Sequence, residues 1–114
     1  MPVYSGTNYH PPISTDALIG AFNNSAGGDI SVIAAVAGAN IRIYKIYATI
    51  GGATSITFKN MQGGTTGPLV FGAAGSLFLD LDTNPLVTAA VNTAFIINSS
   101  GAVQVSGFVL YSQS

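Results

Sequence analysis

S-L-F-L-D-L-D at residues 76–82 and T-S-I-T-F-K at residues 54–59 alternate apolar with mostly polar side chains. Leu77, Leu79 and Leu81 fall on one side of this alternation, and Ile56 and Phe58 do the same in the second run. Successive side chains of a β-strand point to opposite faces, so each run predicts a strand with one face toward a core.

The rest of the chain after Asp29 follows the same pattern of short runs rich in Val, Ile, Thr, Phe and Tyr. Gly, Asn and Pro interrupt the runs at intervals of roughly ten residues, which is typical of a sandwich. We therefore expect an all-β fold, an antiparallel β-sandwich of the jelly-roll type with about eight strands. The expected strands are 30–37, 40–50, 54–61, 68–72, 76–82, 86–91, 93–98 and 102–112.

Two details of the expected strands concern local backbone geometry. The apolar positions in 40–50 change phase between Ile43 and Tyr44, which predicts a β-bulge near Ile43. Gly51 and Gly52 follow that strand directly and predict a tight hairpin turn with positive φ.

Residues 1–28 differ from the remainder and predict an extended N-terminal arm, which leaves residues 29–114 as the jelly-roll domain. Pro11 and Pro12 favour extended backbone in the residues before them. The arm is too apolar to remain in solvent, and the last strand has apolar side chains on both faces, so each needs cover from the chain itself or from a neighbour. The side chains expected to bind a partner are Tyr4, Tyr9, Ile13, Leu18, Phe22, Phe108 and Leu110.

Charge is scarce in this chain of 114 residues. Charged residues make up 6% of it, whereas roughly 25% is usual for a soluble domain. A net charge of −1 gives copies little mutual repulsion, so we expect a homo-oligomer. Three basic residues are too few to form the phosphate-binding surface of a nucleic-acid-binding protein. The longest nearly uniform apolar run, 32–39, is too short to cross a bilayer, so no membrane partner is expected.

Residues for catalysis and for metal binding are equally scarce. His10 is the single histidine and there is no cysteine, so a nucleophilic triad would depend on His10 and a distant aspartate. Asp80 and Asp82 begin a calcium-loop pattern, but Pro85 stands at its sixth position and Val91 at its twelfth. We therefore expect a protein that is not an enzyme, with no catalytic residues, cofactor or metal site, and we keep a weak calcium site at Asp80 and Asp82 as the alternative.

Four segments, 32–43, 55–59, 67–71 and 105–111, carry a resemblance to a known group of proteins. They include the I-R-I, T-F-K and closing G-F-V-L-Y sequences, and together they resemble small structural proteins of tailed bacteriophages, of the head decoration or cement type. The resemblance implies a jelly-roll domain, usually a homotrimer, on the surface of a virion.

The function implied by this resemblance is that of a capsid decoration protein, which binds and stabilises the assembled lattice of a major capsid protein. Its location would be the capsid surface of the virion, assembled in the host cytoplasm. The alternative is a receptor- or carbohydrate-binding module of a tail or fibre, with Tyr44 and Tyr47 as candidate sugar-stacking residues.

Overall fold

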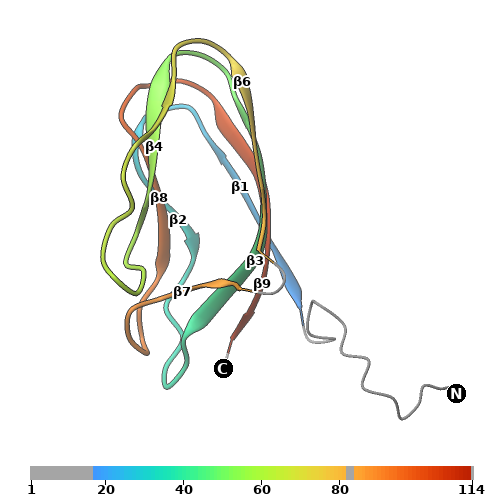
Figure 1. Cartoon of the computed structure of the whole chain (residues 1–114), viewed down its shortest axis with the longest axis vertical. Coiled ribbons are helices and arrows are strands. Elements are labelled where there is room, and N and C mark those ends of the chain that lie inside the picture. The colour runs from blue at the N-terminus through green and yellow to red at the C-terminus, as the bar shows by residue number, and fades with distance from the viewer. Residues whose placement is uncertain (1–16, 82–83, 114) are drawn as a thin grey trace, which may run out of the picture.

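The computed structural model describes residues 17–81 and 84–113, and these residues form β-strands joined by turns and loops (Figure 1). The strands are β1 (Leu18–Asn24), β2 (Gly28–Ile33), β3 (Ile41–Ile50), β4 (Thr54–Lys59), β5 (Leu69–Phe71), β6 (Gly75–Asp80), β7 (Leu86–Val87), β8 (Phe95–Ser99) and β9 (Val105–Gln113). All named pairs are antiparallel.

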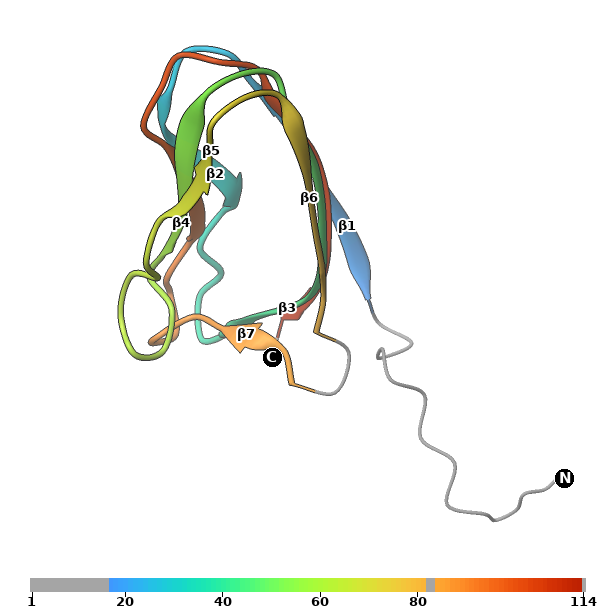
Figure 2. The same cartoon turned by 45° about the horizontal axis from the view of Figure 1, so that its top comes forward.

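The strands make two sheets that face each other across the core (Figure 2). Sheet A has the order β1-β9-β3-β6, with β7 also paired to β3, and sheet B has the order β2-β8-β4-β5. Apart from the short β7 and from β4 and β5, which pair within sheet B, successive strands lie in different sheets, which is the jelly-roll arrangement. The predicted fold class is therefore confirmed.

Large aliphatic and aromatic side chains from both sheets fill the space between them. Ile41, Ile43 and Ile46 of β3 are fully buried, and so is Phe95 of β8, whose ring lies 6.0 Å from that of Phe58. The alternation in β4 appears directly in its burial, because Ile56 and Phe58 are buried and their neighbours are partly exposed.

The predicted bulge is confirmed and the predicted hairpin is wrong. In the β3–β9 pairing, Ile43 lies opposite Tyr111 and Lys45 opposite Leu110, which leaves Tyr44 as the extra residue of a bulge. Gly51 and Gly52 have no positive φ, and the chain passes there from sheet A to sheet B. Gly51 allows a close approach to Gln104 instead: its N–H donates to the carbonyl of Gln104 at 2.7 Å, and an added Cβ would lie 3.1 Å from the Cβ of Gln104.

The predicted arm also needs correction. Its second half, residues 18–24, is strand β1 and pairs along its length with β9, so the sandwich begins before residue 29. The run L-I-G-A-F-N-N has no regular alternation that would have predicted a strand. Residues 1–16 lie outside the described residues.

Thr88 provides a test of one buried hydrogen bond of this core. Its side chain is fully buried, and its Oγ1 accepts a hydrogen bond from the N–H of Ile41 at 2.9 Å. We expect Thr88→Val to reduce the free energy of unfolding by roughly 1–3 kcal/mol, because the Ile41 N–H would be buried without a partner. Urea denaturation measures this, and Thr88→Ser is the matched control because it keeps the hydroxyl. Equal stability of the valine variant and the wild type would contradict the assignment.

Candidate functional site: an aromatic interaction face

The outward side of sheet A carries an unusual row of apolar side chains. The strand registers place Ala21, Phe108, Tyr47 and Phe78 side by side across all four strands. We call the outward side chains of Ile19, Ala21, Tyr47, Phe78, Phe108 and Leu110 the aromatic face. These side chains occupy two rows, so four strands about 4.8 Å apart and about four residues along each give the face roughly 250 Å², slightly below the roughly 300–600 Å² of the largest exposed patch on a typical monomer.

The rings of the aromatic face are exposed although they pack on one another. Tyr47 is 48% exposed and Phe78 is 55% exposed. The ring of Tyr47 lies parallel to that of Phe108 at a centroid distance of 5.9 Å, and tilted to that of Phe78 at 5.3 Å. Phe108 therefore stacks on Tyr47, and the three rings form a continuous ridge over the middle of the sheet.

Polar groups border this ridge on both sides. The row that includes Ile19 and Leu110 ends in an ion pair between Lys45 Nζ and Asp80 Oδ2, 3.3 Å apart. The row on the other side consists of Asn23, Ser106, Thr49 and Ser76. An apolar centre with a polar rim is the usual composition of a protein interface.

The outward side of sheet B is different in chemistry. Its registers align Asp29 with Asn98 and Thr57, and Ser31 with Ile96 and Lys59. We call the outward side chains of Asp29, Ser31, Thr57, Lys59 and Asn98 the polar face. The same side also carries Ile96 and Val70, which lies opposite Ser55 and is 75% exposed. The sandwich thus has one side with an aromatic ridge and another side that is mostly polar.

Neither the sequence nor this geometry leads to a recognised relative. Scans of the chain against protein-family models, curated proteins and solved structures found no match. The resemblance to phage decoration proteins remains a prediction.

The side chains predicted to bind a partner fall into three groups. Phe108 and Leu110 lie together on the aromatic face, and Leu18 is 46% exposed at the start of edge strand β1. Phe22 belongs to the core and is 7% exposed, so its assignment to partner binding is wrong for the folded chain. Tyr4, Tyr9 and Ile13 lie outside the described residues.

Phe78 and Ile19 are members of the aromatic face that were not predicted from the sequence as site residues, and Tyr47 was predicted there only as a candidate for sugar stacking. The signal for Phe78 was present, because the alternation that puts Leu77 and Leu79 inward puts Phe78 outward. What the sequence did not reveal is that β6, β3 and β9 are neighbours, since these strands are far apart in the chain.

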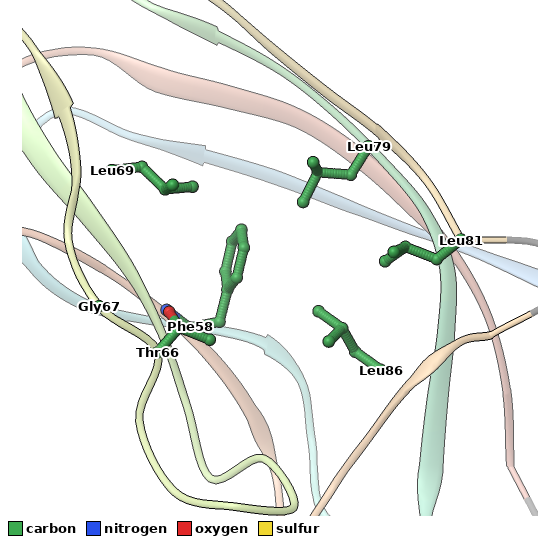
Figure 3. A pocket seen from close by; sticks show the side chains of 7 residues that line it. All are labelled: Phe58, Thr66, Gly67, Leu69, Leu79, Leu81 and Leu86. Carbon is green, nitrogen blue, oxygen red and sulfur yellow. The ribbon is translucent and has the colours of Figure 1, made fainter.

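A second apolar feature is a cavity of about 220 Å³ between the sheets, beside the edge strands β5 and β6. Leu69 of β5 and Phe58 of β4 lie on one side of it, and Leu79 of β6, Leu81 and Leu86 lie on the other side (Figure 3). The hydroxyl of Thr66, also in the lining, already accepts a hydrogen bond from the Phe58 N–H at 3.0 Å. The cavity therefore suits an uncharged hydrocarbon group.

In the described part of the chain, the residues considered for catalysis or metal binding do not lie together in one site. Asp80 pairs with Lys45 at the rim of the aromatic face, while Asp82 and His10 lie outside the described residues. Within residues 17–81 and 84–113 no three His, Cys, Asp or Glu side chains are close enough to hold a metal ion. The same residues contain no helix able to cross a membrane.

Asp29 on the polar face provides a test by pH. Its carboxylate accepts a hydrogen bond from Asn98 Nδ2 at 2.7 Å and pairs with Lys59 Nζ at 3.0 Å; first the amide and then the ammonium lower the pKa of Asp29. A lowered pKa in the folded state stabilises the fold above the unfolded pKa, and this contribution is lost as the pH falls below about 4.

We expect Asn98→Ala to raise the pKa of Asp29 toward its ordinary value, because the largest stabilising contact of the carboxylate is removed. Titration of the Asp29 carboxyl carbon by NMR measures the change. An unchanged pKa in the variant would show that the amide does not hold the carboxylate.

Proposed function

We propose that this protein is a non-enzymatic virion structural protein, a capsid decoration protein that binds and stabilises the assembled lattice of a major capsid protein. The observation that supports this most strongly is the two-sided sandwich. Tyr47, Phe78 and Phe108 form an exposed apolar ridge on sheet A, whereas the outward side of sheet B is mostly polar. A protein that lies on a particle needs one side for the lattice and one side for solvent.

The mechanism of stabilisation is mass action. A ligand that binds the assembled lattice and not its dissociated subunits stabilises the lattice by RT ln(1 + [L]/Kd) at each site. An oligomer of this chain would contact the lattice at several points at once, so individually weak contacts would add up to tight binding. The chemistry at each contact is burial of aromatic rings, which contribute strongly to protein interfaces.

Binding to particles tests this function directly. Heads assembled from the major capsid protein of the phage that encodes the chain are incubated with the purified chain and pelleted, and their thermal disassembly is followed with and without it. We expect saturable binding and a higher disassembly temperature. Heads that neither bind the chain nor gain stability at saturating concentration would contradict the proposal.

The geometry supports this function better than a carbohydrate-binding module. Tyr44, one of the two tyrosines considered for sugar stacking, is 8% exposed and its hydroxyl is 2.8 Å from Ser112 Oγ. Tyr47 is exposed, but one side of its ring faces Phe108. Selective glycan binding by the purified chain, lost on Tyr47→Ala, would favour the module instead.

A further inference from the structure

The two outer edges of sheet A are poorly protected against pairing with another strand. β1 and β6 end the sheet, and each pairs along one side only among the described strands. Edge strands usually carry charges, prolines or bulges that prevent association. β1 reads L-I-G-A-F-N-N and β6 reads G-S-L-F-L-D, so Asp80 is the single charged residue of the two strands and it is already paired with Lys45.

The directions of these edges allow one copy to continue the sheet of the next. Three antiparallel steps, from β1 to β9, β3 and β6, make β1 and β6 run in opposite directions. A second copy placed alongside in the same orientation would therefore bring its β6 antiparallel to β1 of the first. Both strands are of similar length, with seven residues in β1 and six in β6.

The strand registers show which residues of β1 and β6 would lie opposite each other if a second copy continued the sheet. The register rows put Gly20 level with Leu79, Phe22 level with Leu77, and Asn23 level with Ser76. At an intersubunit pairing on these levels, Gly20 and Phe22 would meet leucines on the inner face. On the outer face Asn23 would meet Ser76, Ala21 would meet Phe78, and Ile19 would meet Asp80. No like charges would oppose each other, because β1 carries none.

We propose that β1 of one copy pairs antiparallel with β6 of a second copy, so that sheet A continues from subunit to subunit. This contact rests on the proposed function, for which it supplies the link between copies. Leu18, which is 46% exposed at the start of β1, lies in this contact beside the neighbour's Leu79 and Leu81 and closes the open cavity that they line.

The type of interface follows from the contact. β1 and β6 are opposite edges of the same sheet, so the interface is heterologous, with a different surface used by each partner. Heterologous contacts form closed rings when the rotation between copies permits it. This contact leaves the aromatic face on one side of the ring, where it is free for a different partner.

Disulfide trapping tests the contact, because the chain has no cysteine of its own. Asn23→Cys on β1 and Ser76→Cys on β6 are made as separate variants, mixed and oxidised. Opposed residues of neighbouring antiparallel strands have their Cα atoms about 4.5–5.5 Å apart, which is within the Cα–Cα range that a disulfide spans. We expect a covalent dimer from the mixture and none from either variant alone. A chain carrying both substitutions should give a covalent ring with the stoichiometry of the native oligomer.

Three results would overturn the inference. One is a covalent dimer from Asn23→Cys alone, which would mean that β1 pairs with β1. Another is cross-linking of Asn23→Cys to the control Ser31→Cys on the polar face. The third is an oligomer that sediments normally but yields no disulfide in the mixture. Because sedimentation shows whether an oligomer exists, failure of the contact is distinguished from failure of the proposed self-association.

Leu18→Asn tests the cavity separately in the cysteine-free chain. We expect it to weaken the oligomer at least tenfold in dissociation constant, since an amide would replace the side chain that closes an apolar cavity. Val91→Asn is the matched control, because Val91 is 45% exposed on a loop away from β1. Equal oligomer stability in the two variants would remove Leu18 from the contact.

Discussion

Gly107→Ala is expected to destabilise the protein by roughly 3 kcal/mol or more, the largest effect of any single substitution considered. Gly107 lies in β9, between β1 and β3, and has a φ of 155°, which side chains rarely adopt. A Cβ atom at this position would lie 1.9 Å from the backbone oxygen of Tyr47 and 2.8 Å from the Cα of Ala48. Both contacts are with backbone, so no rotamer change relieves them and the β3–β9 pairing would have to move.

Urea denaturation of the variant measures this effect. Gly72→Ala is the matched control, because an added Cβ there meets nothing within 4 Å and the φ is not positive. We expect the control to stay within about 0.5 kcal/mol of the wild type. A Gly107→Ala chain as stable as this control would show that β3 and β9 are not as close as described.

Replacement of Tyr47 and Phe78 by lysine is expected to abolish binding to heads while the sandwich remains folded. Each ring is about half exposed, so its replacement lowers the free energy of unfolding of the isolated chain by little more than the lost ring contacts. These contribute about 1 kcal/mol for each aromatic pair. At an interface the loss is larger, since a buried aromatic anchor contributes 2 kcal/mol or more, equivalent to about 30-fold in affinity.

The control for this variant is a double substitution on the other side of the sandwich, Ser31→Lys with Thr57→Lys on the polar face. It adds the same charge and is expected to leave binding within a few-fold of the wild type. Pelleting with heads measures both variants, and circular dichroism confirms that both are folded. Equal loss of binding in the two variants would point to charge alone and would contradict the role of the aromatic face.

The sequence predicted the parts of this fold that depend on local alternation. Leu77 and Ile56 were placed inward, and the bulge at Tyr44 followed from a change of phase within β3. It missed β1, because L-I-G-A-F-N-N owes its strand conformation to pairing with β9 and not to a pattern of its own. The predicted hairpin turn at Gly51 was wrong for a similar reason, since a contact with the distant Gln104 sets the backbone geometry there.

The candidate site was predicted only in part. Phe108 and Leu110 were identified because β9 is apolar on both faces. Phe22 was assigned to a partner because its strand was not recognised, and as a member of β1 its side chain turns to the core. The aromatic face depends on rows that join residues 21, 47, 78 and 108, and a sequence without its strand order does not show which strands are adjacent.

Sedimentation of the full chain over a range of concentrations tests the central claim most directly, namely that this charge-poor surface is covered by protein. The claim rests on a chain with 6% charged residues, an aromatic face on one sheet and two poorly protected strand edges. We predict a discrete oligomer at micromolar concentration in ordinary buffer. A stable monomer throughout the range would contradict the account.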